Sequence, residues 1–600
     1  MPEIHLSQIF IKVGGADISS DLMNVLREVV VDSSLQLPSM FTLSFSDPQL
    51  KWVDDALFDL GKEVEISAKA LDNTQGVLIK GEITALEPSF SAMGDTRLVV
   101  RGYDKAHRLH RGKKTRTFLK MKDSDLVSTI AGEVGLSAQA DATTVTYDYI
   151  LQNNQTNMEF LAARAERIGY QLFVADGKLY FKKGDAFLGD GPELKLAEAL
   201  TSFQPTIAGT HQANTMKIMG WDVKMKRAIT AQATPNSALN QGGLGKTGGA
   251  AAQSAFGAAE TVITDQPVFT ADEATALANG LSNDISRDFF QAEGTCTGDP
   301  RVKAGYKVTI KGVGTRFSGK YFVTSATHVY NASGYETQFS ISGRQPNTLS
   351  HLLESSNNEA LGLMHGVVVG LVTNLKDPDD LGRVKVKYPW LGDNIESDWI
   401  RLSSPMAGSG RGFLYLPEVN DEVLIAFEHG DVHHPYIVGA LWSSTDKPLK
   451  KNSEVVGDDG KVNQRLIQTR AGHVILFDDK QGEEKVSITS KSGHTVILDD
   501  KSGSESITIK DKSGNNKMVI DSTKNSMTIN VNGDFTVDAK GKVSIKSTQA
   551  MNLESMAKAT VKGTAGLSLD GTSQAELKGA QVSVNGSAMT EVKGGLVKIN

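Results

Sequence analysis

Apolar and polar residues alternate along most of the C-terminal quarter of the chain, and the alternation repeats at a fixed spacing. Gly472, Gly493 and Gly514 are 21 residues apart, and the first two open the related phrases GHVILFDD and GHTVILDD. Each 21-residue unit holds two short alternating stretches, for example 496–498 and 507–509. Alternation with a period of two is typical of a strand that turns one face to a core. The repeat therefore predicts a stack of short strands joined by glycine turns.

From residue 537 the repeat shortens to eight residues. The apolar positions of these octads, which we predict to form the core of a needle, are Val537, Ile545, Leu553, Val561, Leu569, Leu577, Val584 and Val592. In the later octads a glycine follows two places on, as in Val561-Lys-Gly563, where the missing Cβ permits a sharp corner. One octad buries only one or two side chains, so the strands must stack about 4.8 Å apart into a prism.

Two kinds of prism fit this pattern. One chain can wind alone as a solenoid, or three identical chains can wind together with each octad forming one side. One strand in eight residues leaves little apolar surface for a lone copy, which favours the three-chain form.

Residues 366–445 contain five short alternating stretches separated by Gly, Pro and Asp, which predicts a small barrel of the OB type. Some OB-folds bind oligonucleotides through stacked aromatic residues and a basic groove. Here Tyr388, Trp390, Trp399 and Phe413 alternate as core residues do, and the stretch from 418 to 431 is acidic. We therefore expect no nucleic-acid binding.

The N-terminal half combines strands with two amphipathic helices. Ser124 can cap a helix that ends at Gly135, and Thr156 can cap a second one that ends at Gly169. Each helix is expected to brace a sheet.

Composition narrows the class of protein. A chain of 600 residues exceeds one core and predicts several domains. With 22% charged residues and a net charge of −7, the chain offers no overall attraction to nucleic acid or anionic membrane. Cys296 is the single cysteine, so no intrachain disulfide can form. The start lacks the basic and apolar regions of a secretory signal, and no apolar run approaches the roughly 18 residues of a membrane span. We expect synthesis in the cytoplasm.

Three local motifs suggest chemistry. His429, His433 and His434 cluster around Asp431, but without regular zinc spacing we interpret them as a solvated loop.

The phrase GLGKTGG invites a P-loop interpretation. Asn240 stands where the motif needs glycine, and we expect neither the preceding strand nor the following helix, so nucleotide binding is not predicted.

Between Arg108 and Arg116 lie five Arg and Lys residues, which we interpret as a solvated or subunit-contact loop. No catalytic residue, cofactor or metal ligand is assigned.

Several longer phrases carry a family resemblance. They are GYDKAHRLHRGKKTRTF, QNNQTNMEFLAARAERIGY, RVKAGYKVTIKGVGTRFSGKYFVTSATHVY, GRVKVKYPW, PEVNDEVLIAFEHGD and HPYIVGALW. In this order, followed by the octads, they resemble the VgrG family and the baseplate hub and central spike of T-even phages. The opening LPSMFTLSFSDPQLKWVDDALFDLGKEVEI looks more like the spikes of extracellular phage-tail-like particles than like those of type VI secretion.

The resemblance implies a mainly β architecture. We expect a hub of β-barrels with a few helices at 1–345, with a flexible insertion at 232–259. A linker at 346–365, an OB-fold collar at 366–445 and a second linker at 446–464 precede a triple-stranded β-helix, the needle, at 465–600.

The resemblance also implies a non-enzymatic spike that acts as a homotrimer. Such a spike caps the hexameric inner tube of a contractile injection system, contacts baseplate proteins and the target membrane on firing, and carries effector cargo. It is assembled into a phage-tail-like particle, which can be extracellular, membrane-anchored or released.

The last residues raise a specific hypothesis. No histidine follows His494 to form a metal site at the tip. We therefore expect a blunt end at which Leu596, Val597, Lys598, Ile599 and Asn600 form a platform for a conical PAAR-type tip protein, the alternative being a frayed chain end. The competing functions are a β-helical adhesin and a polysaccharide-cleaving tailspike. The first needs a receptor domain and the second a carboxylate pair, and the sequence suggests neither.

Overall fold

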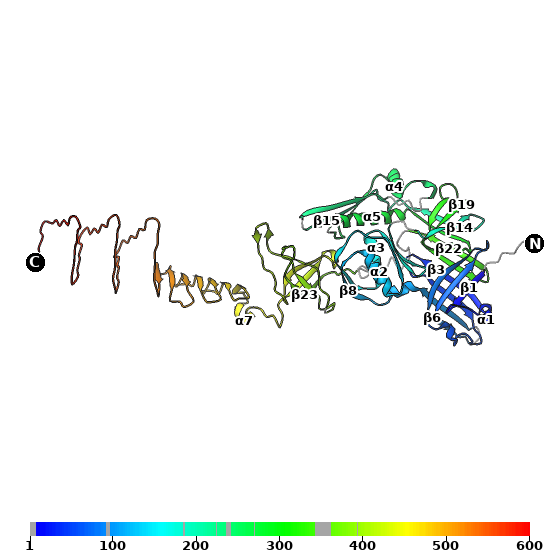
Figure 1. The fold of residues 1–600 in the computed structure, drawn as a ribbon, viewed down its shortest axis with the longest axis horizontal. Coiled ribbons are helices and arrows are strands. Elements are labelled where there is room, and N and C mark those ends of the chain that lie inside the picture. Colours follow the sequence, from blue (N-terminus) through cyan, green and yellow to red (C-terminus); the bar gives the residue numbers. More distant parts are fainter. Residues whose placement is uncertain are drawn as a thin grey trace, which may run out of the picture. The chain divides into compact units, whose positions relative to one another are not determined.

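The chain folds into two compact units, Met1–Pro448 and Leu449–Asn600, each described here by itself. The computed structural model describes residues 8–599 except 36, 92–95, 184–186, 224, 236–241, 269, 343–361 and 393 (Figure 1). Most of the first predicted linker, and Asn600 of the predicted platform, lie outside these residues.

The hub is organised around an eleven-stranded antiparallel sheet. Its strands follow the order β14-β18-β22-β21-β3-β4-β7-β6-β5-β1-β2, so residues from both ends of the hub meet where β3 pairs with β21. Fully buried side chains such as Phe41, Phe45 and Ile66 form its core. The strands are β1 (Gln8–Val13), β2 (Ala16–Asp17), β3 (Leu26–Ser34), β4 (Met40–Ser46), β5 (Glu63–Lys69), β6 (Gln75–Ser89), β7 (Arg97–Asp104), β14 (Leu200–Ile207), β18 (Phe290–Thr297), β21 (Ser325–Asn331) and β22 (Gly334–Ile341).

Closed barrels were expected in the hub, but among the described residues this sheet is open, with β14 and β2 at its two ends. Smaller elements cover it. They are α1 (Ser20–Asn24), η1 (Ala56–Phe58) and the three-stranded sheet of β13 (Gly189–Lys195), β19 (Tyr306–Lys311) and β20 (Gly319–Phe322). The short helix η2 (Lys105–His110) instead packs Ala106 and Leu109 into a second core.

The two predicted helices are present, and only one of the two predicted caps is correct. In α3 (Asn157–Arg167) the Thr156 hydroxyl accepts a hydrogen bond from the Glu159 amide, and the Glu159 carboxylate accepts one from the Thr156 amide. This capping box confirms the predicted start of α3. The prediction for α2 (Asp123–Glu133) is wrong, because Ser124 lies inside the helix and Lys122 is the cap residue, without a side-chain hydrogen bond. Asp123 and Asp125 place negative charge in the first turn, which favours this earlier start.

Helices α2 and α3 brace short sheets, as predicted. Their apolar faces share one core with strands on both sides, including Leu126, Phe160 and Phe181. The strands are β8 (Lys114–Met121) paired with β10 (Tyr147–Gln155), and β9 (Ser137–Ala140) with β11 (Tyr170–Ala175) and β12 (Lys178–Lys183).

A close glycine contact joins α3 to the long helix α5 (Ala271–Arg287). Gly169, with φ +69°, ends α3, and a Cβ there would lie 2.3 Å from the Cα of Gly280 in α5. No larger residue fits at this contact. The opposite side of α5 packs on the sheet of β15 (Thr215–Asp222), β16 (Arg227–Ala233) and β17 (Glu260–Ile263).

The predicted flexible insertion contains ordered structure. Residues Gly242–Leu244 form η3, and Gly248–Phe256 form helix α4, whose amide at Ala250 donates to the Thr247 hydroxyl. The expectation that no helix follows GLGKTGG is therefore wrong. Gly248 and Gly249 are buried against Gln212 and Ala213, where a side chain at either position would clash. The absence of nucleotide binding remains a prediction.

The collar is a closed five-stranded barrel, as predicted. The strands pair in the order β24-β23-β28-β29-β25, and the bridge between Val384 and Ile400 joins the two ends. The collar core also includes Leu151, which β10 of the hub contributes. The elements are β23 (Val367–Asn374), β24 (Lys385–Lys387), β25 (Arg401–Leu402), β26 (Ala407–Gly408), β27 (Arg411–Gly412), β28 (Glu422–Phe427), η4 (Glu428–Gly430) and β29 (Pro435–Ala440).

Two aromatic residues that the sequence placed in this core are not buried. Tyr388 is 2% exposed, whereas Trp390 is 46% and Phe413 49% exposed. Phe413 follows β27, and its amide donates to the Met406 carbonyl beside the β26–β27 hairpin, so alternation there does not mark a residue of the barrel core.

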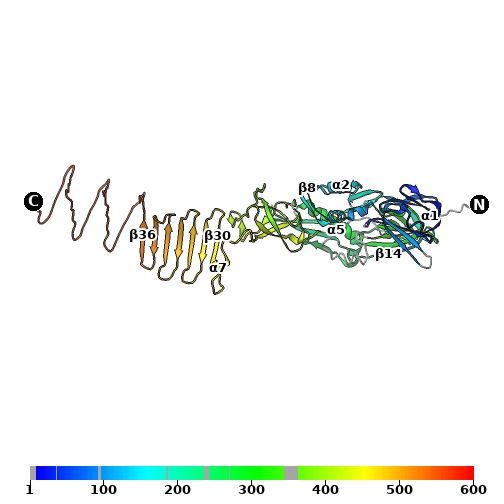
Figure 2. The same ribbon diagram turned by 90° about the horizontal axis from the view of Figure 1, so that it is seen from below.

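The second unit begins with α7 (Asn452–Val455) and continues as a seven-stranded antiparallel meander (Figure 2). The predicted strand pair in the second 21-residue unit is β33 and β34, and Gly472, Gly493 and Gly514 all have φ between +74° and +95° in the turns. The strands are β30 (Gln464–Gln468), β31 (Val474–Asp478), β32 (Lys485–Thr489), β33 (Thr495–Asp499), β34 (Ser506–Lys510), β35 (Lys517–Asp521) and β36 (Ser526–Asn530).

Candidate functional surfaces and a buried ionic network

One face of the seven-stranded sheet is apolar apart from Arg465, which pairs with Phe477 at the β30 end. The register aligns two rows of side chains, because Ile475 pairs with Ile488 and Phe477 with Val486, and each later strand repeats the arrangement. We call this surface the apolar face; it consists of Ile467, Ile475, Phe477, Val486, Ile488, Val496, Leu498, Ile507, Ile509, Met518, Ile520, Met527 and Ile529.

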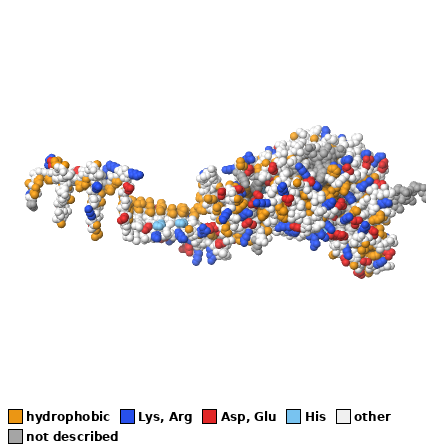
Figure 3. All heavy atoms as spheres, viewed as in Figure 1, with side chains coloured by type: hydrophobic (Ala, Val, Ile, Leu, Met, Phe, Trp, Pro, Cys, Tyr) orange, Lys and Arg blue, Asp and Glu red, His pale blue; other side chains and the backbone are white. Residues whose placement is uncertain are grey.

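The apolar face is open to solvent in the single chain. Ten of its thirteen side chains are among the exposed large hydrophobic residues, and Figure 3 shows them as a continuous band along the sheet. Soluble monomers rarely expose a contiguous apolar patch of this extent. The opposite face carries Ser487, Thr508 and Thr528 in its central row, with Leu466, Leu476, Ile497 and Val519 between them. The sheet is therefore amphipathic, and the apolar face is the one that another surface would have to cover.

The octads that follow are also exposed. All eight predicted core residues are exposed in the single chain, from 66% for Val537 to 89% for Leu553. No strand is assigned among residues 531–599, the part of the octad region that the structure describes. Of the predicted platform, Leu596, Val597 and Ile599 are exposed as well. The needle core and the platform remain predictions.

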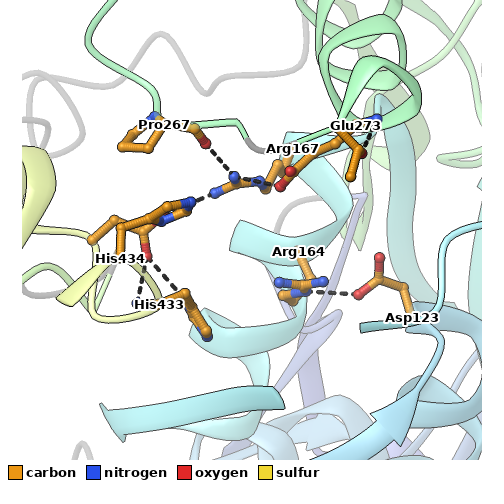
Figure 4. A network of polar contacts seen from close by, with 9 residues as sticks. Asp123, Arg164, Arg167, Pro267, Glu273, His433 and His434 are labelled. Carbon is orange, nitrogen blue, oxygen red and sulfur yellow. Dashed lines mark hydrogen bonds and ion pairs between the residues drawn. The ribbon is translucent and has the colours of Figure 1, made fainter. Parts of the chain in front are cut away.

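A buried ionic network joins the hub to the collar (Figure 4). Arg167 at the end of α3 donates to Glu273 of α5 at 2.6 Å and to Asp431 of the collar at 3.2 Å. A third hydrogen bond from Arg167 reaches the Pro267 carbonyl at 2.5 Å. The Glu273 and Asp431 side chains are each 9% exposed. Burial opposes the charge of Arg167, and the two carboxylates outweigh it and raise its pKa.

His433 and His434 surround Asp431 on its other side. The Leu151 amide of the hub donates to His433 Nε2 at 3.0 Å, so the ring proton sits on Nδ1, which faces Asp431 Oδ1 at 2.9 Å. Burial raises the pKa of Asp431, but the hydrogen bonds from His433 and His434 and the charge of Arg167 hold it well below its usual value. The interpretation of the cluster as a solvated loop is wrong for Asp431 and His434, which are 7% and 4% exposed, whereas His429 is exposed as expected.

A second buried pair stabilises the same helix. Arg164 Nε donates to Asp123 Oδ1 at 2.6 Å, and its guanidinium lies 4.2 Å from the ring centroid of Tyr147. This pair ties α3 to the start of α2. Neither arginine was predicted from the sequence to be part of a site. The available signal was Arg164 itself, a charge within the apolar stripe that Phe160 and Leu161 define on α3.

The basic stretch from 108 to 116 is mostly paired within the hub. Arg108 binds Glu82 at 2.6 Å, and Lys114 and Arg116 both bind Glu133. Arg108 and Lys114 remain solvated, with side chains 41% and 39% exposed, but Lys114 and Arg116 lie in strand β8 and not in a loop. The alternative of a subunit contact remains a prediction. In the described part of the chain no group of three His, Cys, Asp or Glu residues could hold a metal ion. None of the described helices has the length and apolar character that crossing a membrane requires.

Comparisons with known proteins agree with this architecture. Residues 4–331 match the family described as the Alg8 N-terminal domain. Residues 368–442 match the type VI secretion system/phage-baseplate injector OB domain.

Curated relatives match shorter segments. The chain is 27% identical over 217 residues to the actin cross-linking toxin VgrG1 of Vibrio cholerae, covering 32% of this chain and 19% of that protein. It is 32% identical over 139 residues to the type VI secretion system spike protein VgrG5 of Pseudomonas aeruginosa, covering 21% and 18%. The chain thus spans about a fifth of the length of these relatives.

Solved structures overlap more widely at low identity. The E. coli c3393 protein, a component of the type VI secretion system, aligns with a TM-score of 0.45 at 14% identity, covering 72% of this chain and 99% of that one. The Francisella PdpA-VgrG complex in its lidded form aligns with a TM-score of 0.49 at 10% identity, covering 83% and 79%.

A β-rich hub matched by the Alg8 N-terminal domain family is thus followed by a barrel matched by the type VI secretion system/phage-baseplate injector OB domain. The chain belongs to the family of the Alg8 N-terminal domain and is a homologue of the VgrG spike proteins.

Proposed function

We propose that this chain is the homotrimeric spike and hub of a contractile injection system. In this role it caps the inner tube, punctures the target envelope, and carries a tip protein or effectors. It is a structural protein, made in the cytoplasm and assembled into a phage-tail-like particle.

The observation that carries the proposal is the exposed apolar face of the sheet. Fully burying a large aliphatic side chain contributes about 1.5–3 kcal/mol, so thirteen such residues in contact with water are a strong drive for association. Three copies that turn these faces to a common axis bury all of them at once. The octads also require other copies, because no part of the same chain buries their predicted core residues.

The OB domain and the VgrG homology support the place of the trimer in an injector. Sheets that share one hydrogen-bonded ladder resist compression along the needle, because many hydrogen bonds must break together before a strand gives way. We further propose the triple-stranded β-helix for residues 465–600 and the tip platform at Leu596, Val597, Lys598, Ile599 and Asn600.

The location of the chain in assembled particles tests this function. Phage-tail-like particles purified from the producing cell would be labelled with gold through an epitope tag on this chain. Label at the end of the tube that leads on contraction is expected. Particles that assemble and contract without the chain, or label along the sheath, would contradict the proposal.

The platform needs a separate test. Deleting residues 595–600 is expected to abolish capture of the tip protein encoded with this chain, while trimer formation is retained. Undiminished capture by the shortened chain would remove the platform and leave the spike assignment intact.

A further inference from the structure

The two long edges of the seven-stranded sheet carry opposite charge. Every other turn of the meander lies on the same edge, so the turns divide into two groups. The basic edge comprises residues 468–474, 489–495 and 510–517, with five Lys or Arg against one Asp. The acidic edge comprises residues 478–485, 499–506 and 521–526, with eight Asp or Glu against four Lys. The sheet of one chain therefore has a net charge of about +4 along its basic edge and about −4 along its acidic edge.

Many of these charged side chains make no ion pair within the described chain, although Glu484, Asp499 and Glu505 accept hydrogen bonds from turn residues of their own edge. On the basic edge Lys491, Lys510, Lys512 and Lys517 make no ion pair among the described residues, because the one carboxylate there, Asp511, accepts hydrogen bonds from Ser513 and Asn516 instead. On the acidic edge no ion pair within the described chain reaches Glu484, Asp499, Asp500 or Glu505. Both edges are thus available to another copy.

We propose that the basic edge of each copy lies against the acidic edge of the next, which sets all copies parallel around the needle axis. This inference rests on the proposed homotrimer and adds to it the contact that fixes its direction. A ring built from such unlike edges closes on itself without leaving a free edge.

The competing arrangement is an antiparallel pair of sheets. If one sheet is turned end over end and placed on the apolar face of another, basic edge meets basic edge and acidic meets acidic. Burying the apolar face alone does not distinguish this pair from the parallel ring, because hydrophobic contact has no preferred direction. Like charges placed opposite one another disfavour the wrong arrangement.

The strength of the effect comes from repetition. A single exposed ion pair contributes little, about 0–1 kcal/mol. Here the charged turns recur every 21 residues, so three turns of one edge meet three of the other along the stack. The edges therefore select direction and partner, and the apolar face supplies the affinity.

An edge-swapped chain tests the inference. Lys491→Glu, Lys512→Glu and Lys517→Glu reverse the basic edge, and Glu484→Lys, Asp500→Lys and Glu505→Lys reverse the acidic one. The net charge of the chain is unchanged. The swapped edges are complementary to each other, but each repels the matching edge of the unaltered chain.

The two chains would be co-expressed with different tags and the trimers sorted by tandem affinity purification and native mass spectrometry. Random assembly makes about three quarters of the trimers mixed. We expect mixed trimers to be depleted at least about fivefold, because each mixed contact places like charges together. Random mixing would overturn the edge inference and leave the trimer standing, whereas an unaltered chain that is monomeric would overturn both.

If the swapped chain does not form a trimer by itself, a chain that carries only the three Lys→Glu changes is tested instead. They are expected to weaken the trimer in low salt and to spare it in about 1 M salt, where screening shortens electrostatic interactions to roughly 3 Å. A trimer equally stable in both conditions would overturn the inference.

Discussion

The two units of the chain treat their apolar side chains in opposite ways. In the hub, Phe41, Phe45 and Val31 are completely buried by other parts of the same chain. In the second unit Phe477 and Ile488 remain exposed although their strands pair in register, and the octad residues, which belong to no assigned strand, are exposed as well. Hydrogen bonding within one chain is therefore sufficient to form the sheet but not to bury its core. The hub thus buries its own core, whereas the proposed needle would need other copies to cover its apolar face.

The largest expected effect is on the association of copies through the apolar face of the second unit. Replacing Ile488 and Ile509 with Asp places two charges on the apolar face, where the proposed trimer would bury them without partners. We expect complete loss of the trimer, measured by sedimentation velocity. The matched control is Thr508→Asp on the opposite face of the same strand, which should leave the trimer unchanged. Equal behaviour of the two variants would contradict the proposed use of this face.

A second test addresses the self-sufficient hub. Arg167→Ala leaves the buried carboxylates of Glu273 and Asp431 without their cation, so we expect a loss of about 3–5 kcal/mol in the free energy of unfolding. Chemical denaturation followed by tryptophan fluorescence measures it. The control is Arg227→Ala, because its 3.7 Å contact with Asp222 is exposed and should change stability by less than about 0.5 kcal/mol.

Trimer formation should be unaffected by Arg167→Ala, because the network lies entirely within the first unit. A variant that loses the trimer without losing hub stability would show that the two units depend on each other.

The hub should also have a pH dependence of its own. Burial of His328 lowers its pKa to about 3, and its Nδ1 contacts the Tyr335 hydroxyl at 2.8 Å. In the unfolded chain a histidine titrates near about 6.5, so below that pH the unfolded state binds a proton that the folded state does not. The stabilisation is complete above pH 6.5 and is lost as the pH falls, by about 2 kcal/mol at pH 5.

Denaturant titrations at pH 5 and pH 7 check this expectation. His328→Gln removes the titrating group and should flatten the difference between the two pH values. An unchanged slope in the variant would assign the pH dependence to other groups.

The smallest expected effect sharpens the description of the helix caps. Thr156→Ala removes a hydrogen bond to the Glu159 amide and should cost about 1 kcal/mol in the free energy of unfolding. Ser124→Ala is the matched control within α2, where no amide depends on that hydroxyl for its cap, and should be nearly neutral. A comparable loss of stability for Ser124→Ala, again measured by denaturant titration, would indicate that Ser124 caps α2, as the sequence suggested.

Local patterns predicted the elements that local physics determines. The strands at 495–499 and 506–510, the capping box at Thr156 and the collar barrel all follow from short-range periodicity and from turn or cap residues. Alternation misled at Phe413, because an exposed irregular segment can alternate without belonging to the barrel core.

The ionic network could not be predicted from short-range patterns. Arg167 and Asp431 are separated by 264 positions, and their contact depends on how α3 meets the collar. A charged residue within an apolar stripe, such as Arg164, indicates that a buried partner must exist but does not identify it. For the octad core the opposite holds: the short-range pattern predicts buried side chains, but a single chain does not bury them.

The solution mass of the unaltered chain, measured by light scattering after size exclusion, tests whether identical copies cover the apolar face. We expect a single species of three times the 64.4 kDa of one chain. A stable, folded species of 64.4 kDa with its strands at 464–530 protected from hydrogen exchange would contradict it, because the apolar face would then be stable in water without partners.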